Sequence, residues 1–138
     1  MASGRVIALD IGTVRIGAAV SDPSRIVAQG LGVWNAGTWR EDFGEAVRKY
    51  DPAVVVVGLP LRTDGKPSEA AGRVSAIVDG LREDYPGIEL VMWDERFTTV
   101  IAQRAMIEAD TSRRKRRKSV DKVAAVIILE DWLESRRR

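Results

Sequence analysis

The amino-acid sequence predicts an α/β fold with a mixed five-stranded sheet, in which three antiparallel strands are followed by two parallel strands, flanked by helices. Two observations predict this class. Apolar segments follow one another in the order three strands, helix, strand, helix, strand and two helices, and strand–helix–strand passages imply parallel pairing through right-handed crossovers. The first two segments are only a few residues apart, which suits an antiparallel hairpin. The 138 residues match the size of one domain, so a single domain over 1–138 is expected.

The N-terminal third predicts three strands. Residues 5–10 and 15–21 are short apolar runs followed by turn residues, which is the pattern of buried strands. A third strand is expected over 26–33, where Gly30 and Gly32 indicate a bulge or a close approach of the backbone.

The middle of the chain alternates helices and strands. A helix is expected over 38–50, with Thr38 as its N-cap, because the apolar residues follow helical spacing. Residues 53–58 are β-branched and apolar on both faces, as in an interior parallel strand. A loop then leads into a helix over 68–85, and the last strand is expected over 88–93.

The C-terminal third predicts two helices around a basic loop. The first helix, over 98–109, can be capped by Thr98 or Thr99. Residues 110–118 are polar and basic, with like charges that repel one another, which favours a flexible loop. The final helix is expected over 119–135.

Carboxylates stand at the ends of two predicted buried strands. Asp10 ends the first strand, where a charge is rare unless it is paired or liganded; the simpler alternative is an Asp that starts a turn. Asp94 and Glu95 follow the last strand. Because successive side chains alternate between faces, only one of these two can point to the side of Asp10, and alternation alone does not choose between them. Both could instead cap a helix or pair with Arg96.

A third carboxylate lies on the final helix. Asp121 precedes the apolar stripe of this helix by three and four residues, so it lies on the same face. A helix start at 119 would place Asp121 in the first turn, where the helix dipole favours an anion. A capping Asp on the helix rim is the alternative. The stripe consists of Ala124, Ala125, Ile128, Leu129 and Trp132.

These three carboxylates, from distant parts of the chain, suggest a metal site. Grouped together they would repel one another unless a divalent cation compensates them. Hard oxygen ligands suit Mg²⁺ or Mn²⁺. Two such cations, about 4 Å apart, activate water and stabilise the leaving oxygen in phosphodiester cleavage.

Composition restricts the chemistry further. The chain has no His and no Cys, which excludes Ser-His-Asp and Cys-His catalysis, disulfides, and zinc sites built from Cys and His. No run of 18 apolar residues occurs, so no membrane span is expected. The N-terminus lacks the charged and apolar regions of a signal peptide, and the cytoplasm is therefore the expected compartment.

Charge is unevenly distributed along the chain. Residues 1–103 hold 11 basic and 14 acidic side chains, whereas residues 104–138 hold 11 basic and 6 acidic. Such asymmetry suggests a polyanionic partner such as nucleic acid; the alternative is a solvated, flexible segment. The excess lies in Arg136-Arg137-Arg138 and in a basic run that consists of Arg113, Arg114, Lys115, Arg116, Arg117 and Lys118.

Four motifs, in order, resemble those of the YqgF/RuvX family and span nearly the whole chain. The family is described as Holliday-junction-resolvase-like with a ribonuclease H-like fold, and its members are also assigned to maturation of the 5′ end of pre-16S ribosomal RNA. The motifs are Leu9-Asp10-Ile11-Gly12 with 15–22, Val57-Gly58-Leu59-Pro60-Leu61 with Asp64-Gly65, Asp94-Glu95-Arg96-Phe97-Thr98-Thr99, and 121–129.

The resemblance implies that Asp10, Glu95 and Asp121 are the catalytic residues and metal ligands, and so selects Glu95 over Asp94. It also places Arg15 near a substrate phosphate, although Arg15 could be an ordinary surface residue of the hairpin. Arg96, Thr98 and the basic run are assigned to nucleic-acid binding. The basic run falls where the family has a mobile loop, and here it is unusually dense in charge.

The function implied by the resemblance is an endonuclease that depends on Mg²⁺ or Mn²⁺, with two ions, and cuts structured nucleic acid. Its substrate would be either the 5′ end of pre-16S rRNA or a Holliday junction in DNA recombination and repair. One alternative is a non-catalytic nucleic-acid-binding module, which predicts binding without metal-dependent turnover. The other is an actin/sugar-kinase-like nucleotide-binding domain, because residues 9–13 resemble its first phosphate loop. Those kinases bind ATP between two such domains, and this chain has the length of one.

Aromatic residues and assembly are less informative. Trp34 and Trp39 fall in a predicted loop, where they could stack on bases or cover a partner surface. Trp93 and Trp132 have apolar neighbours and are expected in the core. Two cuts at a junction would require a symmetric homodimer, but no dimer interface is readable in the sequence.

Overall fold

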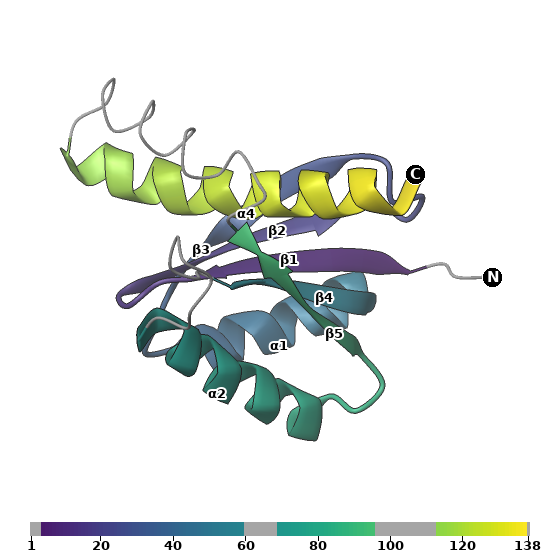
Figure 1. Ribbon diagram of the computed structural model, residues 1–138, viewed down its shortest axis with the longest axis horizontal. Helices are drawn as coiled ribbons and strands as arrows, with labels where there is room; N and C mark the ends of the chain where they lie inside the picture. The colour runs from purple at the N-terminus through teal and green to yellow at the C-terminus, as the bar shows by residue number, and fades with distance from the viewer. Residues whose placement is uncertain (1–3, 60–68, 96–112, 138) are drawn as a thin grey trace.

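A computed structural model of the chain (Figure 1) describes residues 4–59, 69–95 and 113–137, and for 113–123 it describes the backbone only. The helix predicted over 98–109 lies outside these residues, as does most of the loop before residue 68. The described elements are β1 (Arg5–Ile11), β2 (Arg15–Ser21), β3 (Ala28–Asn35), α1 (Trp39–Tyr50), β4 (Pro52–Leu59), α2 (Glu69–Asp84), β5 (Glu89–Asp94) and α4 (Arg113–Arg137).

The five strands form one mixed sheet in the order β3-β2-β1-β4-β5. The β1/β2 and β2/β3 pairs are antiparallel, whereas the β1/β4 and β4/β5 pairs are parallel. This confirms the predicted mixed sheet with three antiparallel and two parallel strands. Because β1, β4 and β5 run in the same direction, their carboxyl ends meet at one edge of the sheet.

Helices cover both faces of the sheet. In Figure 1, α1 and α2 lie on one face and α4 crosses the other. Alternation along β1 divides its side chains between two cores: Ile7 and Leu9 pack on the α1/α2 side, and Val6 and Ala8 on the α4 side. We call these the α1/α2 face and the α4 face. Among the described residues, no helix is both long and apolar enough to cross a membrane.

The aromatic residues of the predicted loop belong to the core instead. Trp39 is the first residue of α1 and is 7% exposed, and Trp34 is half-buried on β3. Their rings lie 6.2 Å and 6.4 Å from that of Phe43. The expectation of a loop at Trp34 and Trp39 is therefore wrong, because Trp34 lies on β3 and packs against the core that buries Trp39 in the first turn of α1. Thr38 is the N-cap of α1, although its side chain makes no cap hydrogen bond.

The third strand begins two residues later than predicted. Ile26 and Val27 belong to the turn before β3, because both backbone N–H groups donate to Oδ1 of Asp22, at 2.7 Å and 2.9 Å. These bonds divert the chain from extended pairing. The predicted bulge is confirmed, since the register of β2 with β3 shifts between Ala18 and Ala19, opposite Gly32 and Gly30.

The final helix begins earlier than predicted. α4 starts at Arg113, so residues 113–118 are helical and the expectation of a loop there is wrong. Lys and Arg are good helix formers, and like-charge pairs on a helix cost only a few tenths of a kcal/mol each. Extending an existing helix is also far easier than starting one. Asp121 consequently lies well inside α4 and not in its first turn, which removes the helix-dipole argument for its position.

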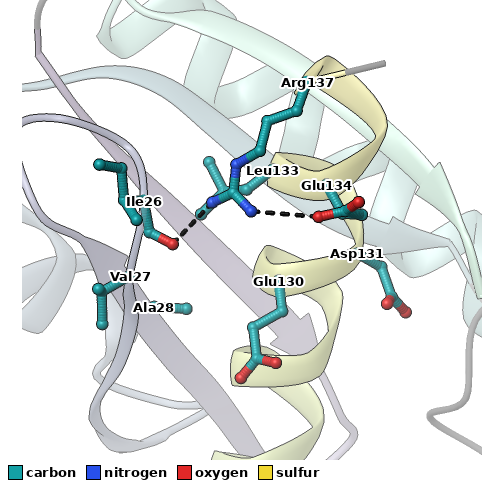
Figure 2. Close-up of a pocket in the computed structure, with 8 residues that line it drawn as sticks. All are labelled: Ile26, Val27, Ala28, Glu130, Asp131, Leu133, Glu134 and Arg137. Carbon is teal, nitrogen blue, oxygen red and sulfur yellow. Dashed lines mark hydrogen bonds and ion pairs between the residues drawn. The ribbon is translucent and has the colours of Figure 1, made fainter.

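The C-terminal end of α4 is tied to the turn between β2 and β3 (Figure 2). Nη2 of Arg137 donates to the carbonyl oxygens of Ile26 at 2.7 Å and Arg25 at 3.4 Å, while Nη1 pairs with Glu134 at 3.1 Å. A groove of about 420 Å³ lies between this turn and the helix. These bonds fix the long helix at one end, on the side of the sheet opposite to the carboxyl ends of the parallel strands.

The Asp22 turn gives a pH-dependent prediction. Hydrogen bonds from the N–H groups of Val27 and Ile26 hold the pKa of the Asp22 carboxyl below its ordinary value of 3.8. A group with a lowered folded-state pKa stabilises the fold above its unfolded pKa, and this stabilisation is lost as the pH falls through the folded pKa. We expect Asp22→Ala to lower the melting temperature near pH 7, and the difference from the unsubstituted chain to shrink below about pH 4. Thermal melting as a function of pH checks this, and a difference that stays constant or widens in acid would contradict it.

Candidate active site at the ends of the parallel strands

Asp10 lies near the carboxyl end of β1 with little side-chain bulk beside it. It follows Val6 and Ala8 in the alternation, so it belongs to the α4 face, and it is only 6% exposed. Its partner on β2 is Gly17. On β4 its neighbour is Gly58, since the preceding pair is Leu9 with Val57. Asp10 is therefore flanked on both adjacent strands by residues without side chains.

Glu95 reaches the same place from β5. Val91 and Trp93 pack in the core under α4, and Glu95, one residue beyond the end of β5, lies on the same face beside Ile128. A Cβ placed on Gly58 would lie 3.2 Å from Cδ of Glu95 and 2.7 Å from Cδ1 of Ile128 on α4. The Glu95 side chain thus lies over Gly58, next to α4, and is 5% exposed.

The structure separates the two acidic residues that alternation could not distinguish from sequence. Leu90 and Met92 pack on the α1/α2 core, so Asp94 follows them to the face away from Asp10. Glu95 and Asp10 share the α4 face on either side of Gly58. Burying carboxylates costs free energy unless cations or hydrogen bonds compensate them, so two at one sheet edge mark this edge as a functional candidate.

This arrangement fits a divalent cation. The donors are carboxylate oxygens, which Mg²⁺ and Mn²⁺ prefer, and the absence of a side chain at Gly58 lets the Glu95 carboxylate lie against the strand next to that of Asp10. Among the residues whose side chains are described, no three acidic, His or Cys side chains are grouped closely enough to hold a metal ion. The third predicted ligand, Asp121, has a described backbone only. Position 121 lies three and four residues before Ala124 and Ala125, which pack on the sheet.

The predicted nucleic-acid-binding residues are described unevenly. Arg15 is half-buried on β2 and alternates with Gly17 and Ala19, so it lies on the α4 face with Asp10. Arg96 and Thr98 lie outside the described residues. The basic run 113–118 forms the first turns of α4, whose backbone extends beyond the carboxyl edge of the sheet in Figure 1.

Sequence reasoning underestimated two glycines. Gly17 and Gly58 lie within apolar strands, and neither was singled out from the sequence as a site of close approach. A glycine inside a strand indicates a close approach of another group, and that signal was available at both positions. What the sequence could not supply was the identity of the approaching groups, Glu95 and Ile128 at Gly58, because these come from distant segments.

Comparison with known proteins agrees with this geometry. Residues 4–135 match the model of a family described as "RuvX: Holliday junction resolvase". The chain belongs to the RuvX family. Members named "Putative pre-16S rRNA nuclease" from Thermoanaerobacter pseudethanolicus and Bacillus thuringiensis are each 39% identical over 137 residues, covering 96% of this chain and 98% and 99% of theirs. As a RuvX member, the chain is a nuclease by homology.

Solved structures confirm the ribonuclease H-like fold of this RuvX chain. RuvC of Thermus thermophilus in complex with a Holliday junction superposes with a TM-score of 0.57 at 16% identity, covering 97% of this chain and 96% of RuvC. The yeast mitochondrial Holliday junction resolvase Ydc2 also gives 0.57, at 12% identity, covering 94% of this chain and 78% of Ydc2. At these identities the likeness concerns the fold.

Gly58 gives a steric prediction. Gly58→Ala should push Glu95 and Ile128 out of place, lower stability by roughly 1–3 kcal/mol as overpacked cores do, and reduce nuclease activity. Gly72→Ala is the matched control, because a Cβ on Gly72 in α2 would meet nothing within 4 Å, and alanine favours a helix by roughly 0.5–1 kcal/mol. Urea unfolding and a cleavage assay check both variants. A Gly58→Ala protein as stable and as active as the unsubstituted chain would show that the close packing is unimportant.

Proposed function

We propose that this chain is a divalent-cation-dependent endonuclease that processes the 5′ end of pre-16S rRNA. The observation that carries the proposal is that Asp10 and Glu95 are both buried on the α4 face at one edge of the sheet, with Gly58 between them. This geometry provides a binding place for hard cations where a phosphodiester can approach the ends of three parallel strands.

Asp10, Glu95 and Asp121 would hold Mg²⁺ or Mn²⁺, with two ions as the expected number. When bound, such ions supply Lewis-acid activation of water and neutralise charge that develops on the leaving oxygen. The residues of the chain would position the carboxylates that hold these ions. β1 holds Asp10, Glu95 stands one residue beyond the end of β5, and Ile128 of α4 lies beside Glu95 over Gly58.

Cationic groups around the site would bind the phosphate backbone. Arg15 lies on the same face as Asp10, on the strand that pairs with β1. The basic run adds six positive charges in the first turns of α4, beyond the carboxyl edge of the sheet. Neutralising phosphates in this way releases counterions and drives sequence-independent binding.

The choice of RNA over a DNA junction rests on the relatives. Proteins that match nearly the whole chain at 39% identity carry the pre-16S rRNA nuclease name, whereas RuvC, solved with a Holliday junction, shares the fold at 16% identity. Holliday-junction cleavage is the competing activity, and the family description favours testing it in the same assay.

Replacing one carboxylate tests this function directly. With Mn²⁺ present, we expect the unsubstituted chain to cut a pre-16S rRNA fragment at its 5′ side, and Asp10→Asn to cut it at least ~100-fold more slowly, since even residues that merely orient metal ligands cost 10–100-fold. RNA binding should persist in Asp10→Asn, because the basic residues are unchanged.

Asp94→Asn is the matched control, because Asp94 adjoins Glu95 but lies on the other face of the sheet. It should retain cleavage. An Asp10→Asn protein that cuts as fast as the unsubstituted chain would refute the assignment of the site. Cleavage of a four-way DNA junction, with the rRNA fragment left intact, would refute the substrate.

A further inference from the structure

The turn between β1 and β2 is held rigidly at the edge of the candidate site. The N–H of Gly12 donates to the carbonyl of Arg15 at 2.9 Å, and the N–H of Ala36 donates to the carbonyl of Val14 at 2.9 Å. A Cβ on Gly12 would lie 2.7 Å from that Arg15 carbonyl oxygen, so the tight turn requires glycine. Thr13 and Val14 are exposed at the tip, with Val14 61% exposed. The turn thus presents a fixed surface three to four residues after Asp10.

Arg73 joins this surface from the opposite side of the sheet. It lies in the second turn of α2, next to the fully buried Val74 on the α1/α2 face, and its own side chain is exposed. Nη2 of Arg73 donates to Oγ1 of Thr13 at 3.2 Å. In Figure 1 the start of α2 lies beside the β1–β2 turn, in agreement with this contact. The guanidinium is therefore directed to the same edge at which Asp10 and Glu95 lie.

The charge of Arg73 is not used in an ion pair within the described part of the chain. Glu69 stands four residues earlier on the same helix, the usual spacing for a helical ion pair, but Arg73 donates to the neutral Thr13 hydroxyl instead. Three other exposed arginines are in ion pairs: Arg40 with Asp84, Arg82 with Asp79 and Arg137 with Glu134. A guanidinium has five N–H donors, and the bond to Thr13 engages one of its nitrogens.

We propose that Arg73, positioned by Thr13, binds a backbone phosphate of the nucleic acid on the side of the active site opposite to α4. This inference rests on the proposed nuclease function and extends it. Arginine suits the role because its planar fork binds phosphate oxygens in pairs. With the basic run on one side of the sheet edge and Arg73 on the other, a strand passing over Asp10 and Glu95 would be held on both sides of the bond to be cut.

Salt dependence of RNA binding tests this role. A fluorescent single-stranded RNA that spans the 5′ cleavage site of pre-16S rRNA is titrated with the full chain in EDTA, so that no cleavage occurs, at several salt concentrations. Each phosphate contact contributes about 0.7 to the slope of log K against log salt for single strands. We expect Arg73→Gln to weaken binding and to reduce this slope by about 0.7, while the melting temperature is unchanged.

Two further variants separate charge from structure. Arg82→Gln, on the same helix but paired with Asp79, should leave both affinity and slope unchanged. Arg73→Lys should restore most of the slope compared with Arg73→Gln, because the slope depends on the positive charge at this position. If Arg73→Gln binds with the unaltered affinity and slope while the unsubstituted chain binds well, the inference is overturned and the proposed function stands. If the unsubstituted chain does not bind RNA at all, both the role of Arg73 and the proposed function are refuted.

Discussion

The close packing of α4 on the sheet is the constraint on which the rest of the structure depends. Ala124 and Ala125 of the helix share one buried cluster with Ala8 and Ala19 of the sheet, together with larger aliphatic residues such as Val56. At Gly58 there is room for hydrogen only, because Ile128 and Glu95 occupy the space that a methyl group would need. The same contact that completes the core therefore also fixes one carboxylate of the candidate site, so stability and site geometry are coupled at this position.

The packing of α4 on the sheet also determines where acidic and basic residues lie. Two carboxylates are buried on the α4 face at the carboxyl ends of parallel strands, where the protein is locally acidic. Two basic side chains lie near that core, Arg15 half-buried on the same face and Arg73 at the β1–β2 turn, and the backbone of the basic run forms the first turns of α4. An acidic centre surrounded by basic groups is what a nuclease needs if cations are to be held centrally and phosphates peripherally.

Much of the fold could be predicted from sequence because it depends on local patterns. The β-branched run around Val55 and the alternation in β1 and β2 were sufficient for the strands and their pairing. The start of α4 was predicted wrongly because repulsion within the basic run was weighted above the helix propensity of Lys and Arg. The burial of Trp39 depends on the path of the chain into α1, which no local pattern records.

Some residues of the candidate site could also be predicted from sequence, and others could not. Asp10 could be singled out because a charge at the end of an apolar strand is unusual. The choice between Asp94 and Glu95 came from family resemblance, since it depends on which face of β5 packs under α4. The contact between Gly58 and Glu95 shows that Glu95 lies on the α4 face, and its role as a ligand stays a prediction. The link between Arg73 and Thr13 joins residues 60 positions apart, and nothing in either local sequence indicates it.

Mn²⁺ binding followed by electron paramagnetic resonance measures whether Asp10 and Glu95 form one cation site. The titration is made on the unsubstituted chain, on Asp10→Asn, on Glu95→Gln and on the double variant. If the two carboxylates share one site, each single replacement should weaken Mn²⁺ binding by about tenfold or more. The double variant should then bind Mn²⁺ almost as well as the single variant of lower affinity, because the effects of residues that share one site are not additive. Unchanged Mn²⁺ binding in the single variants, or losses of affinity that add independently in the double variant, would show that Asp10 and Glu95 do not share a cation.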